Sequence, residues 1–180
     1  MKCIYYLSPT LKSTQSISDD LHSIGIDDWF LHIHNKDESG LVKQHLHSSN
    51  YLETLDLIRE GFIGAGLGFL AGLCTAGITS VTDPFGAPVP LIGYVGIIFL
   101  ITCFGAWLGG LAGVASENKK IANFHQEIIS GQYLVLIYAK DSQINDIQIM
   151  MTNKHPEVVL AAVDANFFNP FADLKLISSL

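Results

Sequence analysis

Residues 61–81 read GFIGAGLGFLAGLCTAGITSV, and residues 91–115 read LIGYVGIIFLITCFGAWLGGLAGVA. Asp83 is the only charged residue from 61 to 116, although charges are frequent on both sides of this stretch. As a helix the first run would rise about 31 Å, which matches the hydrocarbon layer of a bilayer, and the second is long enough to span with some tilt. The connector, TDPFGAPVP at 82–90, holds three prolines and a glycine and predicts a turn. A transmembrane helical hairpin over 61–115 explains this pattern better than a buried helix pair of a soluble protein.

Glycines are concentrated in this predicted hairpin. It holds thirteen of the 16 glycines, and three glycines in each span follow one another at intervals of four residues. This spacing forms a groove on one helix face and lets two backbones approach closely, as helices do when they associate in lipid. The predicted helix-packing residues are Gly64, Gly68, Gly72, Gly105, Gly109 and Gly113. Packing within one chain and packing between subunits are both consistent with the spacing.

Basic residues near the spans predict the orientation. Arg59 precedes the first span, Lys119 and Lys120 follow the second, and the connector carries none. Positively charged flanks stay on the cytoplasmic side, so both termini are expected in the cytoplasm. The N-terminal apolar stretch is also too short for a secretory signal.

Charge and cysteine content exclude some classes of function. The net charge is -7 and the ten Lys and Arg residues are not clustered, so nucleic acid is not an expected partner. The cysteines Cys3, Cys74 and Cys103 are odd in number and lack metal-type spacing, so no disulfide framework is predicted.

The polar segments on either side of the hairpin resemble two halves of one α+β domain. The first half predicts a strand at 2–7, a helix from Thr10 to Gly25, and a strand at 28–34 with Trp29, Leu31 and Ile33 on one face. The second half predicts a helix over 116–131, a strand at 133–139, a helix capped by Asp141 and a strand at 157–163. This order predicts a ferredoxin-like sheet with strands 3–7 and 133–139 side by side at its centre.

The predicted fold class is therefore an α+β membrane protein with a split ferredoxin-like (βαβ…βαβ) cytoplasmic domain and an inserted glycine-rich two-helix transmembrane hairpin. Residues 1–60 form the N-terminal half and a pre-membrane helix that Asn50 caps, 61–115 the hairpin, 116–165 the C-terminal half, and 166–180 a tail. Asn169-Pro170 predicts a short helix in the tail, with Phe171, Leu174 and Ile177 on one side.

Short motifs spread over nearly the whole chain resemble one known family. They are Tyr5-Tyr6-Leu7-Ser8-Pro9, His32-Ile33-His34, Asp56-Leu57-Ile58-Arg59-Glu60-Gly61, Phe104-Gly105-Ala106-Trp107, Phe124, Gly131-Gln132 and Asn153-Lys154-His155-Pro156-Glu157. They resemble the bacterial membrane proteins grouped as domain of unknown function 1269. The resemblance implies a bacterial inner-membrane protein, and it supplies no catalytic residues.

Two pairs of histidines are candidate metal ligands. His32 and His34 share a strand face, and His45 and His47 follow in a loop with Asp37 in reach. If the loop folds back, four imidazoles can meet a metal such as zinc. The alternatives are histidines that are merely solvated or packed, and a surface that responds to pH; no cofactor is predicted.

Catalysis and transport have weaker support in the sequence. No nucleophile elbow, phosphate-binding loop or zinc-protease helix is present, so no enzyme is predicted. Thr75, Thr79 and Thr102 are candidates to line a passive pore, but two spans per chain enclose one only in a ring of subunits. Otherwise these hydroxyls bond to helix carbonyls.

The sequence thus predicts a homo-oligomeric integral inner-membrane protein of the structural or interaction class. Its expected partners are the lipid bilayer and further copies of itself. A passive pore and a metal- or ligand-sensing regulator are the alternatives.

Overall fold

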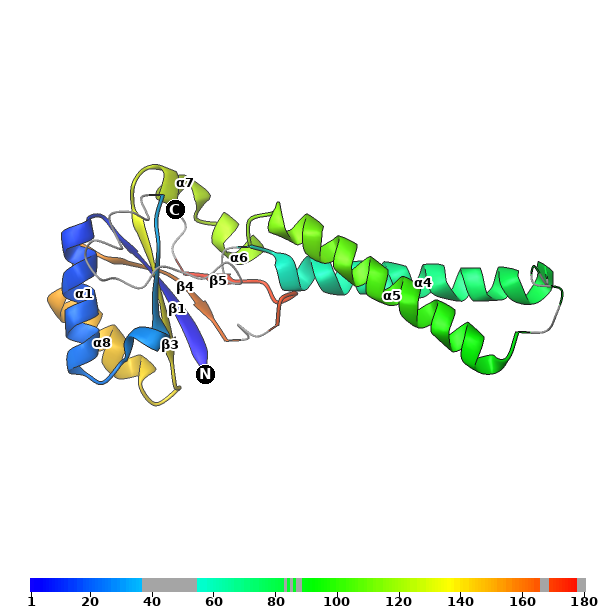
Figure 1. Cartoon of the computed structure of the whole chain (residues 1–180). Coiled ribbons are helices and arrows are strands. Elements are labelled where there is room, and N and C mark those ends of the chain that lie inside the picture. The colour runs from blue at the N-terminus through cyan, green and yellow to red at the C-terminus, as the bar shows by residue number, and fades with distance from the viewer. Residues whose placement is uncertain (37–54, 83, 85, 87–88, 166–168, 178–180) are drawn as a thin grey trace. The chain divides into compact units, whose positions relative to one another are not determined.

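The computed structural model describes residues 1–36, 55–82, 84, 86, 89–165 and 169–177. The chain is α+β and divides into two compact units, one made of residues 1–50 and 119–180 and the other of residues 51–118. The first unit holds an antiparallel sheet with helices, and the second holds two long apolar helices (Figure 1). The segment just before the first predicted span therefore groups with the hairpin.

The sheet of the first unit has five strands in the described residues, in the order β2-β3-β1-β4-β5. They are β1 (Lys2–Ser8), β2 (Leu31–His34), β3 (Tyr133–Ala139), β4 (Val159–Asp164) and β5 (Lys175–Leu176). β1 pairs with β3 along its whole length, from Lys2 opposite Ala139 to Ser8 opposite Tyr133, and its other edge pairs with β4. The predicted adjacency of β1 and β3 is confirmed.

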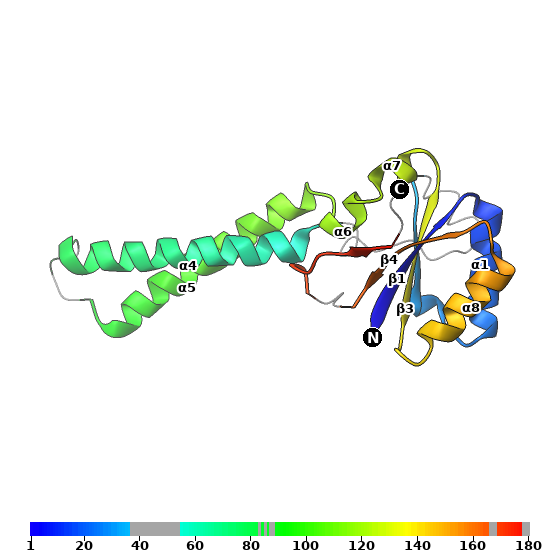
Figure 2. The same cartoon turned by 180° about the vertical axis from the view of Figure 1, so that it is seen from behind.

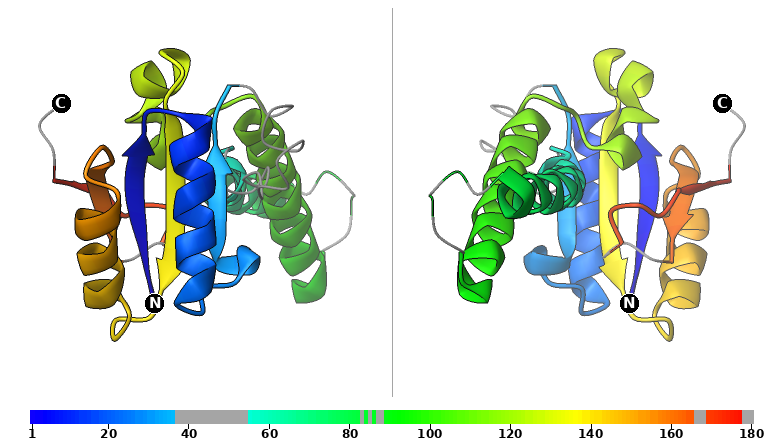
Figure 3. Two further views of the ribbon diagram at one scale, coloured as in Figure 1. Left: turned by 90° about the vertical axis from the view of Figure 1, so that its left-hand side faces the viewer. Right: turned by 90° about the vertical axis from the view of Figure 1, so that its right-hand side faces the viewer.

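Helices cover both faces of this sheet (Figure 3). Residues that alternate along β1 and β3 point to opposite faces, so each strand supplies two apolar cores. Ile4 and Tyr6 pack with α1 (Leu11–Ser23) and α8 (Ile144–Lys154). Cys3, Tyr5 and Leu7 pack with α6 (Lys119–Ala122) and α7 (His125–Ile129).

Local sequence signals set the ends of several helices as predicted. The Thr10 hydroxyl accepts a hydrogen bond from the Ser13 amide at 3.2 Å and caps α1. Gly25 follows α1 with φ 84°, and Gly131 follows α7 with φ 97°, conformations that favour glycine.

The second predicted strand is shorter than expected. Residues Asp28–Phe30 form a 3₁₀ turn, η1, and β2 begins only at Leu31. The Phe30 amide donates to the Asp27 carbonyl at 2.9 Å and closes this turn. The prediction that Trp29 shares a strand face with Leu31 and Ile33 is therefore wrong: Trp29 lies in η1 and is 78% exposed, whereas Leu31 and Ile33 are buried.

The single helix predicted over 116–131 is also wrong. The chain forms two short helices, α6 and α7, separated at Asn123 and Phe124, and Phe124 has the non-helical angles φ -112° and ψ 15°. The break places the fully buried Phe124 ring against Tyr5, with 5.9 Å between ring centroids. Burial of a large aromatic side chain outweighs a few lost helical hydrogen bonds.

Two boundaries near the C-terminus differ from prediction as well. Gln143, rather than Asp141, occupies the N-cap of α8, and β4 covers Val159–Asp164. No helix forms in the described part of the tail, where β5 instead pairs with β4 and the Ile177 amide donates to the Ala161 carbonyl at 2.9 Å. The predicted tail helix is wrong because an open sheet edge offered backbone partners that the local capping signal does not reveal.

The second unit is a helical hairpin of α4 (Leu57–Thr82) and α5 (Leu91–Val114), which run side by side in both opposite views (Figure 2). α4 begins four residues before the predicted span and so includes Arg59 and Glu60. The Asp56 amide donates to the Ser116 carbonyl at 3.1 Å and joins the two ends of the hairpin. The helix predicted to begin at Asn50 and to pass through Leu55 is wrong at its described part, because Leu55 forms an isolated β-bridge with Glu117 and the helix begins only at Leu57; residues 50–54 lie outside the described residues.

Candidate functional site

The helix pair α4–α5 is held together by backbone contacts at glycines. A Cβ atom built on Gly68 would lie 3.1 Å from the Cα atom of Gly105, and one built on Gly72 would lie 2.9 Å from the Cα atom of Ile98. Atoms built on Gly64, Gly105 and Gly109 would meet backbone carbonyl oxygens of the facing helix even more closely. Any side chain at these positions would force the helices apart, so this contact requires glycine.

All six glycines singled out from the sequence lie in this contact. Gly113 completes the set, because a Cβ atom there would lie 2.6 Å from the Cα atom of Leu57. Four other glycines of the two helices have no neighbouring atom within 4 Å of such a Cβ: Gly66, Gly77, Gly96 and Gly110. Of the two alternatives that the spacing left open, the structure shows packing between the two helices of one chain.

The outer surfaces of both helices are apolar and exposed. Large hydrophobic side chains point away from the contact along the whole pair, and Val81 and Leu91 are 85% and 79% exposed. The buried residues of the two helices are mainly small: Gly68, Gly72, Ala76, Thr79 and Gly113. By length and composition, α4 and α5 are two helices that could cross a membrane.

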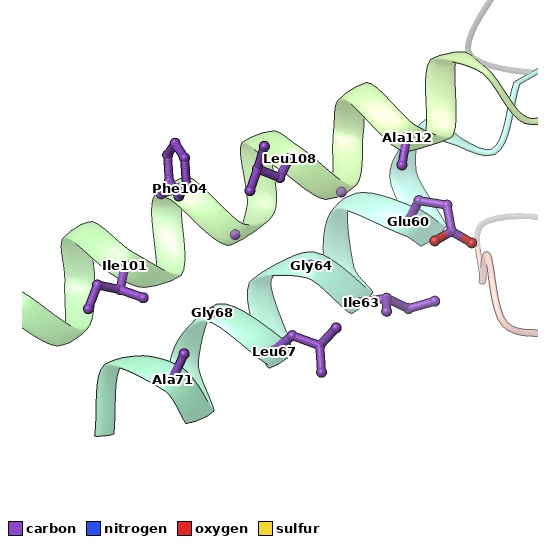
Figure 4. A pocket seen from close by; sticks show the side chains of 12 residues that line it. Glu60, Ile63, Gly64, Leu67, Gly68, Ala71, Ile101, Phe104, Leu108 and Ala112 are labelled. Atoms are coloured by element: carbon purple, nitrogen blue, oxygen red, sulfur yellow. The ribbon is translucent and has the colours of Figure 1, made fainter. Parts of the chain in front are cut away.

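A groove runs along one side of the helix pair (Figure 4). It has a volume of about 480 Å³ and exists because glycines and alanines leave space between larger apolar side chains. Ile63 and Leu67 of α4 and Phe104 and Leu108 of α5 lie along it. Glu60 is its single charged lining residue and lies at one end.

Three charged residues meet beside that end of the groove. The Nη1 atom of Arg59 donates to Oδ2 of Asp56 at 3.1 Å and to Oε1 of Glu60 at 2.8 Å. The negative charge of Glu60 also lies in the first turn of α4, where the helix dipole favours an anion. Sequence reasoning missed Glu60 as a site residue because it began the span at Gly61; the spacing of Asp56 and Arg59, three residues apart, was the available signal of a continuing helix.

The predicted pore-lining threonines are bonded within their own helices. The hydroxyls of Thr75, Thr79 and Thr102 donate to carbonyls four residues earlier, at 2.9, 2.8 and 2.7 Å respectively. Thr79 is buried in the helix pair whereas Thr75 is exposed. Each of the three hydroxyls is thus bonded to a carbonyl of its own helix.

The histidine cluster is only partly within the described residues. His32 and His34 are half-buried and lie on the same face of β2, where the His32 ring packs edge-on against Tyr138 with centroids 5.5 Å apart. Within the described chain, no three His, Cys, Asp or Glu side chains are arranged to hold a metal. His45, His47 and Asp37 lie outside the described residues.

A second group of charges joins α1 to the end of α8 in the first unit. Nε2 of the buried His155 lies 3.0 Å from Oδ2 of Asp20, and its Nδ1 lies 3.7 Å from Oε1 of Glu157. A hydrogen bond from Lys154 holds the pKa of Asp20 below its usual range, with a smaller contribution from His155. A hydrogen bond from the Ser13 hydroxyl is the main cause that lowers the pKa of Glu157. These side chains satisfy one another's hydrogen-bonding groups and join α1 to the end of α8.

Comparison with known protein families, curated proteins and solved structures finds no match for this chain. The resemblance to domain of unknown function 1269 therefore stays a prediction.

Proposed function

We propose that this chain is an integral membrane protein of the structural or interaction class, in which α4 and α5 form a bilayer-spanning hairpin that anchors the α+β unit. One observation carries the proposal: two long helices pack on each other through glycine backbones and turn their large apolar side chains outward. Helices this apolar in a soluble protein are buried in its core. Lipid is the solvent that makes such an outer surface favourable.

We also propose that the first unit has a ferredoxin-like topology that the hairpin interrupts. The order β2-β3-β1-β4 with antiparallel neighbours supports this description, since each βαβ half then spans one intervening strand. In this proposal the fifth strand, β5, is an addition at the β4 edge.

The proposed location is the bacterial inner membrane, with both termini in the cytoplasm. Arg59 supports this orientation at the start of α4. Lys119 and Lys120 after α5 support it as well, because the positive-inside rule counts Lys and Arg, and their acidic partners Asp173 and Asp164 contribute little.

Assembly into homo-oligomers remains part of the proposal, but it requires a surface other than the six predicted glycines. Those glycines are already occupied by the partner helix of the same chain. The native mass of the detergent-extracted protein measures the number of subunits. No observation in the described residues favours the passive pore or the metal sensor over this function.

Membrane insertion is tested by alkaline extraction of membranes from cells that express the full chain. The protein should remain in the pellet, as an integral protein does, and release into the supernatant would overturn the proposal. Orientation is tested in intact cells with Cys3, Cys74 and Cys103 replaced. An impermeant thiol reagent should label a cysteine placed at Asp83 and spare one at Ser13; the reverse result would invert the orientation.

A further inference from the structure

The groove along α4 and α5 has an apolar length and one charged end. Its floor is formed where Gly64 and Gly68 meet Gly105 and Gly109, and its walls are large aliphatic and aromatic side chains (Figure 4). The side chain of Glu60 closes one end, and Ala71 and Ile101 lie at the other. An apolar groove with one charged end is suited to bind an amphiphile rather than a purely polar solute.

The length of the groove corresponds to one leaflet of a bilayer. From Glu60 to Ala71 the helix rises about 16 Å at 1.5 Å per residue, and half of the hydrocarbon layer is about 15 Å thick. If the hairpin spans the membrane as proposed above, Glu60 lies near the headgroups and Ala71 near the midplane. The groove then lies parallel to the acyl chains of that leaflet.

The width of the groove selects a hydrocarbon chain over a helix. A volume of about 480 Å³ along that length corresponds to a mean cross-section of about 30 Å². A helix with its side chains is about 10 Å across and needs roughly 80 Å². A single acyl chain is thin enough to lie within the groove, whereas a helix of a second copy would have to pack across its open side.

The charged residues at the Glu60 end of the groove favour one class of lipid headgroup. Asp56, Arg59 and Glu60 together carry one net negative charge, and Arg59 lies between the two carboxylates. A primary ammonium can donate a charge-assisted hydrogen bond to the Glu60 carboxylate, whereas a quaternary ammonium has no N–H group. A lipid phosphate is attracted to the Arg59 guanidinium. Because Arg59 is one cation shared by two carboxylates, a headgroup with no amine would leave one of the two negative charges uncompensated.

We propose that this groove binds one acyl chain of a phospholipid with a primary-amine headgroup, whose ammonium contacts Glu60 and whose phosphate lies beside Arg59. The inference rests on the proposed membrane insertion, and it names the lipid class that the hairpin recognises.

The test is native mass spectrometry of the full chain, released from micelles that contain equal amounts of phosphatidylethanolamine, phosphatidylcholine and phosphatidylglycerol with matched acyl chains. One ethanolamine lipid should be retained with about a tenfold preference, the effect of one charge-assisted hydrogen bond. Glu60→Gln should abolish the preference but keep the lipid bound. Ala71→Phe, at the opposite end, should reduce retention of all three lipids, while Leu73→Phe on an exposed surface outside the groove should not.

Three results would overturn the inference. They are equal retention of the three lipids, an unchanged preference in Glu60→Gln, and a loss of subunits rather than lipid in Ala71→Phe, which would place a second copy in the groove. Alkaline extraction of the wild-type protein and the same variants distinguishes a failure of the proposed lipid binding from a failure of the proposed membrane insertion. A protein that stays in the membrane without lipid preference overturns only the inference, whereas release of the wild-type protein overturns membrane insertion itself.

Discussion

Gly64 and Gly109 face each other in the contact between α4 and α5. A Cβ atom built on Gly109 would lie 3.0 Å from the Cα atom of Gly64, and one built on Gly64 would lie 2.9 Å from the Cα atom of Gly109. The neighbouring Gly110 faces open space, with no atom within 4 Å of such a Cβ. Two adjacent glycines of one helix therefore have opposite tolerance for a side chain.

Gly109→Ala should destabilise the hairpin, and Gly110→Ala should not. The added methyl at 109 meets the Glu60 carbonyl and must separate the helices, and overpacking of this kind costs about 1 to 3 kcal/mol. Thermal unfolding of the detergent-solubilised protein measures both variants. Equal melting temperatures for the two variants would contradict the close helix approach.

Lys120→Met should destabilise the first unit far more than Lys119→Met. The Nζ atom of Lys120 lies 2.6 Å from Oδ2 of Asp164, and the Asp164 side chain is only 1% exposed. Removing Lys120 leaves a buried carboxylate without its cation, at a cost of about 3 to 5 kcal/mol. Lys119 pairs with Asp173 on the surface at 2.8 Å, where such pairs contribute up to about 1 kcal/mol.

Chemical denaturation of the two lysine variants provides the comparison. The matched pair controls for the loss of one positive charge from α6. If both variants unfold at the same denaturant concentration, the Lys120–Asp164 contact does not stabilise the unit.

The first unit should lose stability in acid through Asp20 and Glu157. Both pKa values are lowered in the folded protein, mainly by the hydrogen bonds from Lys154 and from Ser13 respectively. A carboxyl group with a lowered folded-state pKa stabilises the fold above its unfolded pKa, and this contribution is lost as pH falls through the folded value. The melting temperature should therefore fall as the pH decreases below about 4.

Asp20→Asn tests this acid sensitivity. The variant should melt below the wild-type protein at neutral pH, because the contacts to Lys154 and His155 are weakened. In acid the two melting temperatures should converge, since the wild-type carboxyl is then protonated as well. If the difference in melting temperature between the variant and the wild-type protein stays constant from pH 7 to about pH 2, Asp20 does not cause the loss of stability in acid.

The first unit should fold without the hairpin, but only from both of its halves. β1 and β2 do not pair with each other; β3 lies between them and comes from the second half. A chain that joins residues 1–50 to residues 119–180 through a Gly/Ser linker should melt cooperatively by circular dichroism. Residues 1–50 alone should not, and a cooperative transition for that peptide would contradict the split domain.

The sequence predicted features that depend on local chemistry or on strong periodicity. The Thr10 cap, the Gly25 and Gly131 turns and the central pair β1–β3 follow from such signals. The glycine spacing identified the residues of the helix contact, but it could not choose between one chain and two, because both give the same pattern.

Other features depended on partners that are distant in the sequence. The break at Phe124 is hidden because its apolar spacing continues a helical period, although its ring must reach Tyr5. The tail becomes a strand only because β4 has an edge to pair with. The groove beside Glu60 depends on which side chains two antiparallel helices bring together, and neither helix encodes that alone.

The central position of β1 also determines when the sheet can form during translation. β1 is translated before the hairpin, whereas both strands that flank it, β3 and β4, are translated after the hairpin. Until then its apolar residues have no sheet to join, and a chain truncated within the hairpin exposes them to proteases. Closure of the sheet therefore requires a chain in which both long helices have already been synthesised.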